Sequence, residues 1–172
     1  DLAIIKCSDF TSELILPMIT VQDIVGNSPI EPLIASGGTP MDAALTMGFN
    51  LVEEHKVTLK SNGIEYYQPM FFVLSDGDFD VALETIKKLH QSQERNGHCM
   101  FAIGIGSDAC PKSLTAISAK GRAFLLEDTN FSDLFEFMSS SLASVSQSSP
   151  GDKLSVDIPN TMKIVERNSI EL

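Results

Sequence analysis

The sequence is poor in cysteine and in basic residues, and it contains no long apolar run. Its three cysteines include no CxxC pair, which argues against a disulfide framework or a zinc site. Only 12 basic residues stand against 23 acidic ones, a formal charge of -11, so the chain should repel phosphate backbones. No stretch approaches the roughly 18–20 apolar residues that span a membrane, and no signal peptide is visible. We therefore expect a cytoplasmic protein in a reducing compartment, with neither nucleic acid nor membrane as its partner.

The composition supports a folded domain. Hydrophobic residues make up 43% of the 172 positions, enough for a core. We expect one domain over residues 1–149, followed by a tail or an added strand over 150–172 beyond a serine-rich linker. Because the first residue is Asp rather than Met, we expect that the sequence does not begin at the translated start.

The first third of the chain suggests a hairpin, a loop and a helix. Apolar runs at 2–7 and 13–18 predict two antiparallel strands, and the Gly- and Pro-containing stretch 22–38 predicts a loop. A helix should follow with Thr39 as its N-cap, Pro40 at its first position and Asp42 at its third. The polar stretch 56–68 includes the turn sequence Asn-Gly and should lie outside this helix.

The rest of the chain alternates between apolar runs and helical patterns. Strands are expected at 70–74, 99–105 and 123–126, and helices near 80–95, from Pro111 onward and from Phe131 onward. The inward residues expected in the helix near 80–95 are Ala82, Leu83, Ile86 and Leu89. The apolar stripe expected on the last helix comprises Phe131, Leu134, Phe135, Met138, Leu142 and Val145. The alternation predicts a three-layer α/β fold, a doubly wound, mostly parallel, Rossmann-like sheet with helices on both faces.

Two short motifs lie where such a fold binds ligands. They are SGGTPM at 36–41 and FVLSDG at 72–77, and the second places Asp76 at the carboxyl end of a strand. Together they resemble two of the three parts of the metal-ion-dependent adhesion site of von Willebrand factor type A domains. The segments LPM at 16–18, AIGIG at 102–106, the helix from Phe131 and KLSV at 153–156 follow the order of the tellurium-resistance Y-like branch. This resemblance covers roughly residues 1–157.

The resemblance implies a cation-dependent protein-interaction module rather than an enzyme. Mg²⁺, with Mn²⁺ or Ca²⁺ as substitutes, would take the Thr39 hydroxyl and the Asp76 carboxylate as ligands. The partner would be another protein that offers an acidic side chain to the metal, in a cytosolic bacterial stress or tellurium-resistance setting. The DxSxS motif that begins the site in this family, at the end of its first strand, is not found, and DFTSE at 9–13 has only a faint likeness to it. The resemblance therefore implies that the domain over residues 1–149 lacks this first strand and is incomplete at its N-terminal end. The cation site is therefore expected to be partial in this chain.

Two enzyme interpretations remain open as alternatives. The sequence GIGSDA at 104–109, with Glu127 after the next strand, has the pattern of a dinucleotide-binding loop. The sequence DGDFD at 76–80 could belong to a phosphoryl-handling site with Lys112 or Lys120. The same acidic series fails as a calcium loop, because Val81 and Lys87 stand where glycine and glutamate are needed. No catalytic residue is assigned, and the three histidines are expected on the surface.

Overall fold

The computed structural model describes residues 1–8, 10–24, 32, 37–126, 131–147 and 157–165. The chain divides into two compact units. The first comprises Asp1–Glu65 and Phe79–Thr85, and the second comprises Tyr66–Asp78 and Ile86–Leu172. Within the described residues, none of the helices is both long enough and apolar enough to cross a membrane.

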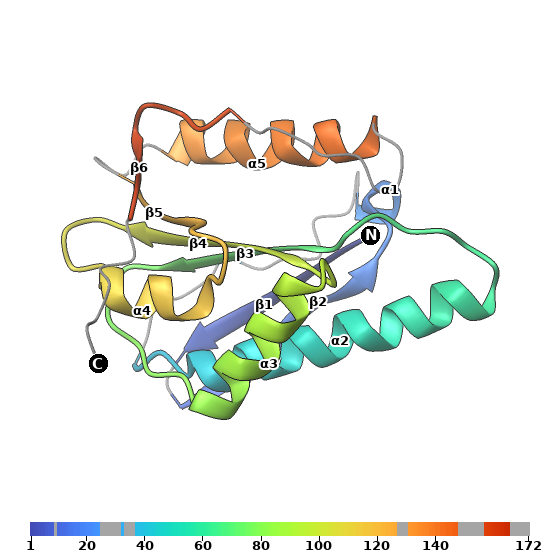
Figure 1. The fold of residues 1–172 in the computed structure, drawn as a ribbon, viewed down its shortest axis with the longest axis horizontal. Helices are drawn as coiled ribbons and strands as arrows, with labels where there is room; N and C mark the ends of the chain where they lie inside the picture. The colour runs from blue at the N-terminus through green and yellow to red at the C-terminus, as the bar shows by residue number, and fades with distance from the viewer. Residues whose placement is uncertain (9, 25–31, 33–36, 127–130, 148–156, 166–172) are drawn as a thin grey trace. The chain divides into compact units, whose positions relative to one another are not determined.

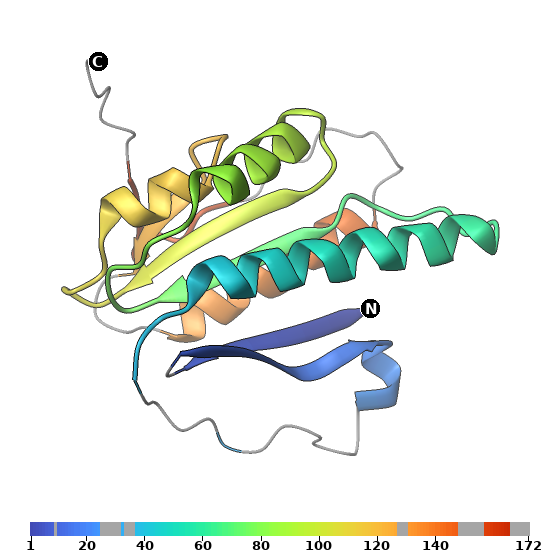
Figure 2. The same cartoon turned by 90° about the horizontal axis from the view of Figure 1, so that it is seen from below.

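The first unit begins with a β-hairpin. Strands β1 (Leu2–Ser8) and β2 (Thr11–Ile19) pair in antiparallel fashion, as the sequence predicted. The four-residue helix α1 (Val21–Ile24) follows, so the expectation of a loop from residue 22 was wrong over its first three positions. Residues 25–31 and 33–36 of the expected loop lie outside the described residues. Figure 2 shows the hairpin with the long helix α2 beside it, and α2 contacts both strands.

Helix α2 (Met41–Ser61) is longer than its apolar pattern indicated. Its buried positions near the start have helical spacing and are Met41, Ala44, Leu45 and Gly48. The helix then continues through residues 56–61 of the polar stretch, where Lys56, Leu59 and Lys60 are good helix formers. Lys56 lies 2.5 Å from Glu53 one turn earlier. The helix ends before the expected turn, where Gly63 has a φ of 69°.

The second unit contains a four-stranded, mostly parallel sheet. Its strands are β3 (Met70–Ser75), β4 (Cys99–Ile105), β5 (Ala123–Leu126) and β6 (Met162–Ile164), in that spatial order (Figure 1). The pairs β3–β4 and β4–β5 are parallel, whereas β5–β6 is antiparallel. The expectation of an α/β fold with a mostly parallel sheet is therefore confirmed. Of the two alternatives for residues 150–172, a tail or an added strand, positions 162–164 form a strand.

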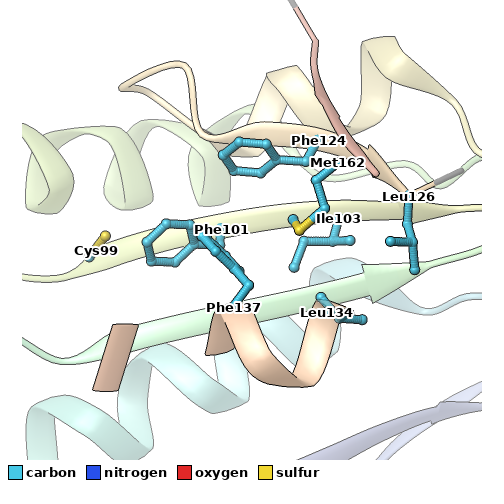
Figure 3. Packing of buried hydrophobic residues seen from close by; sticks show 8 residues of the cluster. All are labelled: Cys99, Phe101, Ile103, Phe124, Leu126, Leu134, Phe137 and Met162. Atoms are coloured by element: carbon cyan, nitrogen blue, oxygen red, sulfur yellow. The ribbon is translucent and has the colours of Figure 1, made fainter. Parts of the chain in front are cut away.

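The core of the second unit lies between this sheet and helix α5 (Phe131–Ser146). Figure 3 shows Phe137 of α5 pointing toward Phe101 and Phe124, and the Phe101 and Phe137 rings meet edge to face at 5.4 Å. The cluster comprises Cys99, Phe101, Ile103, Phe124, Leu126, Leu134, Phe137 and Met162. The contact of aromatic edges with aromatic faces adds to the energy of burial.

The buried face of α5 differs from the predicted stripe. Leu134 is buried as expected, but Phe137, which the prediction left out, is only 1% exposed. Phe135 is 58% exposed, and Phe131 and Leu142 are also exposed. Apolar residues occupy more than one face of this helix, so the spacing alone did not indicate which face the sheet would select.

Helix α4 (Pro111–Ile117) packs against the opposite side of strand β4 from α5. Successive side chains of a strand point to opposite faces, so Phe101 and Ile103 face α5 while Gly104 faces the other way. A side-chain methyl group of Leu114 in α4 lies 2.8 Å from the position that a Cβ of Gly104 would occupy. Both faces of the central strand are therefore covered.

Helix α3 (Leu83–Glu94) begins later than expected. Ala82 precedes it, and Leu83 is 74% exposed, so neither residue has the inward position predicted for it. Leu89 is buried as predicted. The buried Gln93 donates to the Ile117 carbonyl at 2.9 Å and accepts from the Ala119 amide at 3.0 Å, which fastens the end of α3 to the end of α4.

One histidine is not on the surface. His98 is 1% exposed, its Nδ1 lies 2.8 Å from the Ser92 hydroxyl, and its ring meets Phe71 edge to face. The expectation of surface histidines was therefore wrong for His98, because its position directly before a buried strand carries the ring into the core.

Candidate functional site

The candidate site in the second unit is the turn that follows β3. Ser75, the last residue of the strand, is buried, and Asp76 directly after it is exposed. The Ser75 hydroxyl lies 3.4 Å from the Gly77 amide nitrogen and 3.3 Å from its carbonyl oxygen, distances that indicate weak hydrogen bonds. The strand thus fixes the residue before Asp76, while the Asp76 carboxylate itself faces solvent at the carboxyl end of a parallel strand.

Three contacts fix the loop beyond this turn. The Ser113 hydroxyl of α4 donates a short hydrogen bond to the Asp78 carboxylate. The Phe79 side chain is only 7% exposed. The amide of Ala82 donates to Oδ1 of Asp42 at 2.9 Å, a bond between residues 40 positions apart. Each contact fixes its own part of the loop, since Asp78 belongs to the second unit and Phe79 and Ala82 belong to the first. Asp76, Asp78 and Asp80 are all exposed.

The start of α2 differs from the predicted cap. Pro40, not Thr39, is the N-cap residue, and no side chain caps the helix. Asp42 is consequently one position closer to the helix start than expected, and its carboxylate binds the Ala82 amide. Thr39 is half-buried, and its carbonyl accepts from the Met41 amide at 2.7 Å. The Ser12 hydroxyl donates to the Pro40 carbonyl at 3.0 Å, so β2 helps to hold this turn.

The predicted ligands of the cation belong to different parts of the chain. Thr39 lies in the first unit and Asp76 in the second. Ser36 and Asp9, from the two other segments considered for the site, lie outside the described residues, and Thr11 is the exposed first residue of β2. Among the residues that the structure describes, no group of three or more His, Cys, Asp or Glu side chains could hold a metal. A hydroxyl and a carboxylate are nevertheless the kind of donor that Mg²⁺ prefers, and Mg²⁺ commonly keeps several waters.

The glycine loop after β4 is not arranged like a dinucleotide site. A Cβ on Gly104 would lie 2.7 Å from the Ala109 Cβ and 2.8 Å from side-chain atoms of both Leu114 and Leu125. The missing side chain of Gly104 thus permits internal packing, not the approach of a ligand. Helix α4 has seven residues and begins at Pro111, five positions after Gly106. Glu127, the expected ribose-binding acid, lies outside the described residues.

The phosphoryl-handling alternative also gains no support from the loop contacts. Asp78, which would act as the second acid, accepts the hydrogen bond from Ser113. Lys120 is exposed, and its Nζ lies 2.7 Å from Oδ1 of Asn96. Lys112 is exposed on α4. These observations do not favour a nucleophile with a nearby lysine.

The thiols do not have the surroundings of a nucleophile. All three cysteines are free, and Cys99 is buried while Cys7 and Cys110 are half-buried. Burial raises the pKa of the Cys99 thiol, although Arg122 and Lys120 oppose this effect. Burial also raises the pKa of Cys7, and a hydrogen bond with Ser12 opposes it. A raised pKa lowers the fraction of thiolate, the reactive form.

Sequence reasoning missed the two residues that anchor the loop. The sequence analysis predicted Asp42 only as an acidic residue in the first turn of its own helix, and it predicted no role for Ser113. Their roles depend on contacts over 40 and 35 positions, for which a single sequence gives no signal.

The described residues Asp76, Asp78 and Asp80 present exposed carboxylates, a hard type of oxygen donor that suits a cationic group. It offers no nucleophile paired with a base. Comparison of the chain with protein-family models, with curated proteins and with solved structures finds no match in any of the three.

Proposed function

We propose that this chain is an interaction module of the von Willebrand factor type A class, which binds another protein through the loops at the carboxyl edge of its sheet. The observation that carries the proposal is the exposed Asp76 carboxylate at the end of a parallel strand, two positions before Asp78, which accepts a hydrogen bond from Ser113. An anchored loop can hold a charged group in one position without further ordering when a partner binds.

The order of elements supports this class. Parallel strands β3, β4 and β5 alternate with helices α3 and α4, and α5 follows β5, as a doubly wound, three-layer fold requires. Strands β1 and β2 form the antiparallel hairpin that the resemblance implies before the segment SGGTPM. A cytosolic role in stress response or tellurium resistance is the setting proposed with this class.

The proposed cation is Mg²⁺, held through the exposed Asp76 carboxylate. Mg²⁺ in proteins is often bound by one or two carboxylates with water in the remaining positions. A carboxylate of the partner protein would replace one of those waters. The bound cation would supply the positive charge that an acidic partner needs near a chain of formal charge -11. Because the DxSxS motif is not found in this sequence, the proposed site is partial and its affinity is expected to be low.

The experiment is a titration of the protein with Mg²⁺ and with Mn²⁺ by isothermal calorimetry. The variant Asp76→Ala removes the proposed ligand. The matched control is Asp80→Ala, which removes the same charge from another exposed position of the same loop. We expect binding in the wild type and in Asp80→Ala, and no binding in Asp76→Ala.

Equal binding by all three proteins would show that general attraction to an acidic chain is responsible, and it would refute the site at Asp76. Absence of binding in the wild type at millimolar Mg²⁺ would refute cation dependence for this chain. A circular dichroism spectrum of each variant establishes that the fold is retained.

A further inference from the structure

We propose that the hydrogen bond between Ser113 and Asp78 is a latch that couples two neighbouring loops at the carboxyl edge of the sheet. The first loop, residues 76–78, follows β3, and the second loop, residues 106–110, follows β4 and leads into α4. All of these residues belong to the second unit. The coupling is a property of the free protein and requires neither a cation nor a bound partner.

The two loops leave the sheet from adjacent strands. β3 and β4 pair in parallel, and Ser75 at the end of β3 has Gly104 of β4 as its partner in the register. The chain reaches Asp78 three positions after β3, whereas the chain after β4 passes into α4, whose third residue is Ser113. The Ser113 hydroxyl donates to the Asp78 carboxylate across 35 positions of sequence. A movement of either loop that separates these two groups therefore has to break the bond.

The C-terminal end of α4 is held by side chains of α3. Nε2 of His90 lies 2.8 Å from the Ala116 carbonyl oxygen, and the Gln93 amide donates to the Ile117 carbonyl at 2.9 Å. These carbonyls belong to the last turn of α4, where backbone oxygens have no acceptor role within the helix itself. Gln93 is 0% exposed, so water has no access to replace it. This end of the helix is therefore fixed.

The N-terminal end of α4 is held differently. Cys110 is the N-cap residue, and no side chain among the described residues caps the helix there. The latch itself joins the exposed Asp78 to the half-buried Ser113. An exposed hydrogen bond opens more readily than a buried one, because water can take the place of either partner. Opening of the latch therefore frees the first loop and the start of α4 together, while the C-terminal end of the helix stays in place.

Amide hydrogen exchange, resolved by residue with NMR spectroscopy, tests this coupling through three amides. The Gly77 amide makes a weak hydrogen bond to the hydroxyl at the end of β3 and reports the first loop. The Leu114 amide makes the first hydrogen bond of α4 and reports the start of that helix. The Ala119 amide donates to the buried glutamine of α3 and reports the fixed end.

Ser113→Ala removes the donor of the latch. We expect exchange at Gly77 and Leu114 to become about 10-fold faster, the factor that corresponds to loss of one hydrogen bond to a charged group, while exchange at Ala119 stays unchanged. Ser113→Thr keeps a hydroxyl that can donate and should remain near the wild type. Ser107→Ala is the matched control, because it removes a hydroxyl of the second loop whose hydrogen bond goes to the next residue.

Asp78→Ala breaks the same bond from the first loop and should accelerate exchange at Leu114 to a similar extent. If Ser113→Ala does not fold, this variant carries the test alone. In the double variant, Ser113→Ala with Asp78→Ala, the acceleration should not exceed that of either single change, because both remove one interaction.

Three results would overturn the proposal. Unchanged exchange at Gly77 in Ser113→Ala, or at Leu114 in Asp78→Ala, would show that the loops move independently. Equal acceleration at Gly77, Leu114 and Ala119 would show a general loss of stability in place of a local opening. Additive effects in the double variant would show that the two side chains act separately.

Discussion

Substitution of Gly104 by alanine should destabilise the second unit although it adds a single methyl group. Gly104 is buried in the central strand β4. Its new Cβ would lie 2.7 Å from the Cβ of Ala109 and 2.8 Å from methyl carbons of Leu114 and Leu125. Real Cβ atoms essentially never approach other heavy atoms so closely. The two leucine ends can rotate, but the Ala109 Cβ is attached directly to the backbone and can move only with it.

The expected magnitude follows from two opposing effects. Overpacking of a core by one methyl group usually costs about 1–3 kcal/mol. The loss of backbone freedom in the unfolded chain returns about 0.4–1 kcal/mol when glycine is replaced by alanine. The net change should therefore be a decrease of about 1–2 kcal/mol in the free energy of unfolding. For a protein of this size, that corresponds to a fall of roughly 2–8 °C in Tm.

The assay is urea denaturation followed by far-ultraviolet circular dichroism, with a thermal melt as a second measurement. Gly77→Ala is the matched control, because its Cβ would meet no heavy atom within 4 Å. We expect this control to lie within about 0.5 kcal/mol of the wild type. If Gly104→Ala is as stable as Gly77→Ala, the close packing at Gly104 is refuted, and the loop after β4 regains the freedom that a ligand-binding role would need.

Two further predictions concern the core and the thiols. Phe137→Ala should lower the free energy of unfolding, measured by urea titration, by about 3–5 kcal/mol, because the ring is buried. Phe135→Ala, on the exposed side of α5, should change it by less than about 0.5 kcal/mol. Similar losses in both variants would refute the assigned buried face. Burial raises the pKa of the Cys99 and Cys7 thiols, so the folded state favours their neutral form. The stability that this preference contributes is present below about pH 8.5, the ordinary pKa of a thiol. It is lost as pH rises through the raised pKa of the folded state. The free energy of unfolding should therefore fall as pH rises above about 8.5, with a smaller slope in Cys99→Ala than in the wild type, and an equal slope would contradict the assignment.

The strands of the second unit were predictable because their sequences are continuous apolar runs bounded by turn residues. Met70–Leu74, Cys99–Ile105 and Ala123–Leu126 were each placed to within one residue, and their parallel pairing followed from the helical patterns between them. The hairpin of the first unit was predictable for a similar reason, since two apolar runs are separated by a few polar residues.

Helix ends and buried faces were less predictable because they depend on contacts distant in sequence. The polar end of α2 is helical through local propensity, not through an apolar stripe. On α5, Phe137 rather than Phe135 packs against the aromatic rings of the sheet, and the helical spacing is compatible with either residue.

The candidate site was predictable only in part. The position of Asp76 at the end of a strand follows from the sequence, because an apolar run stops there. The contacts of the following loop do not follow, since Asp42 and Ser113 lie 40 and 35 positions from their partners in the sequence. The role of Thr39 as a cap was wrong, and its role as a cation ligand stays a prediction.

The division of the chain into two units has a consequence for how the protein can be taken apart. The polypeptide passes from one unit to the other three times, after Glu65, Asp78 and Thr85. No single cut therefore yields two fragments that each contain a whole unit. During synthesis the first unit lacks seven of its residues until the ribosome has passed Thr85, by which point 13 residues of the second have already been made. Its completion must then wait until the chain has closed across that stretch of the second unit.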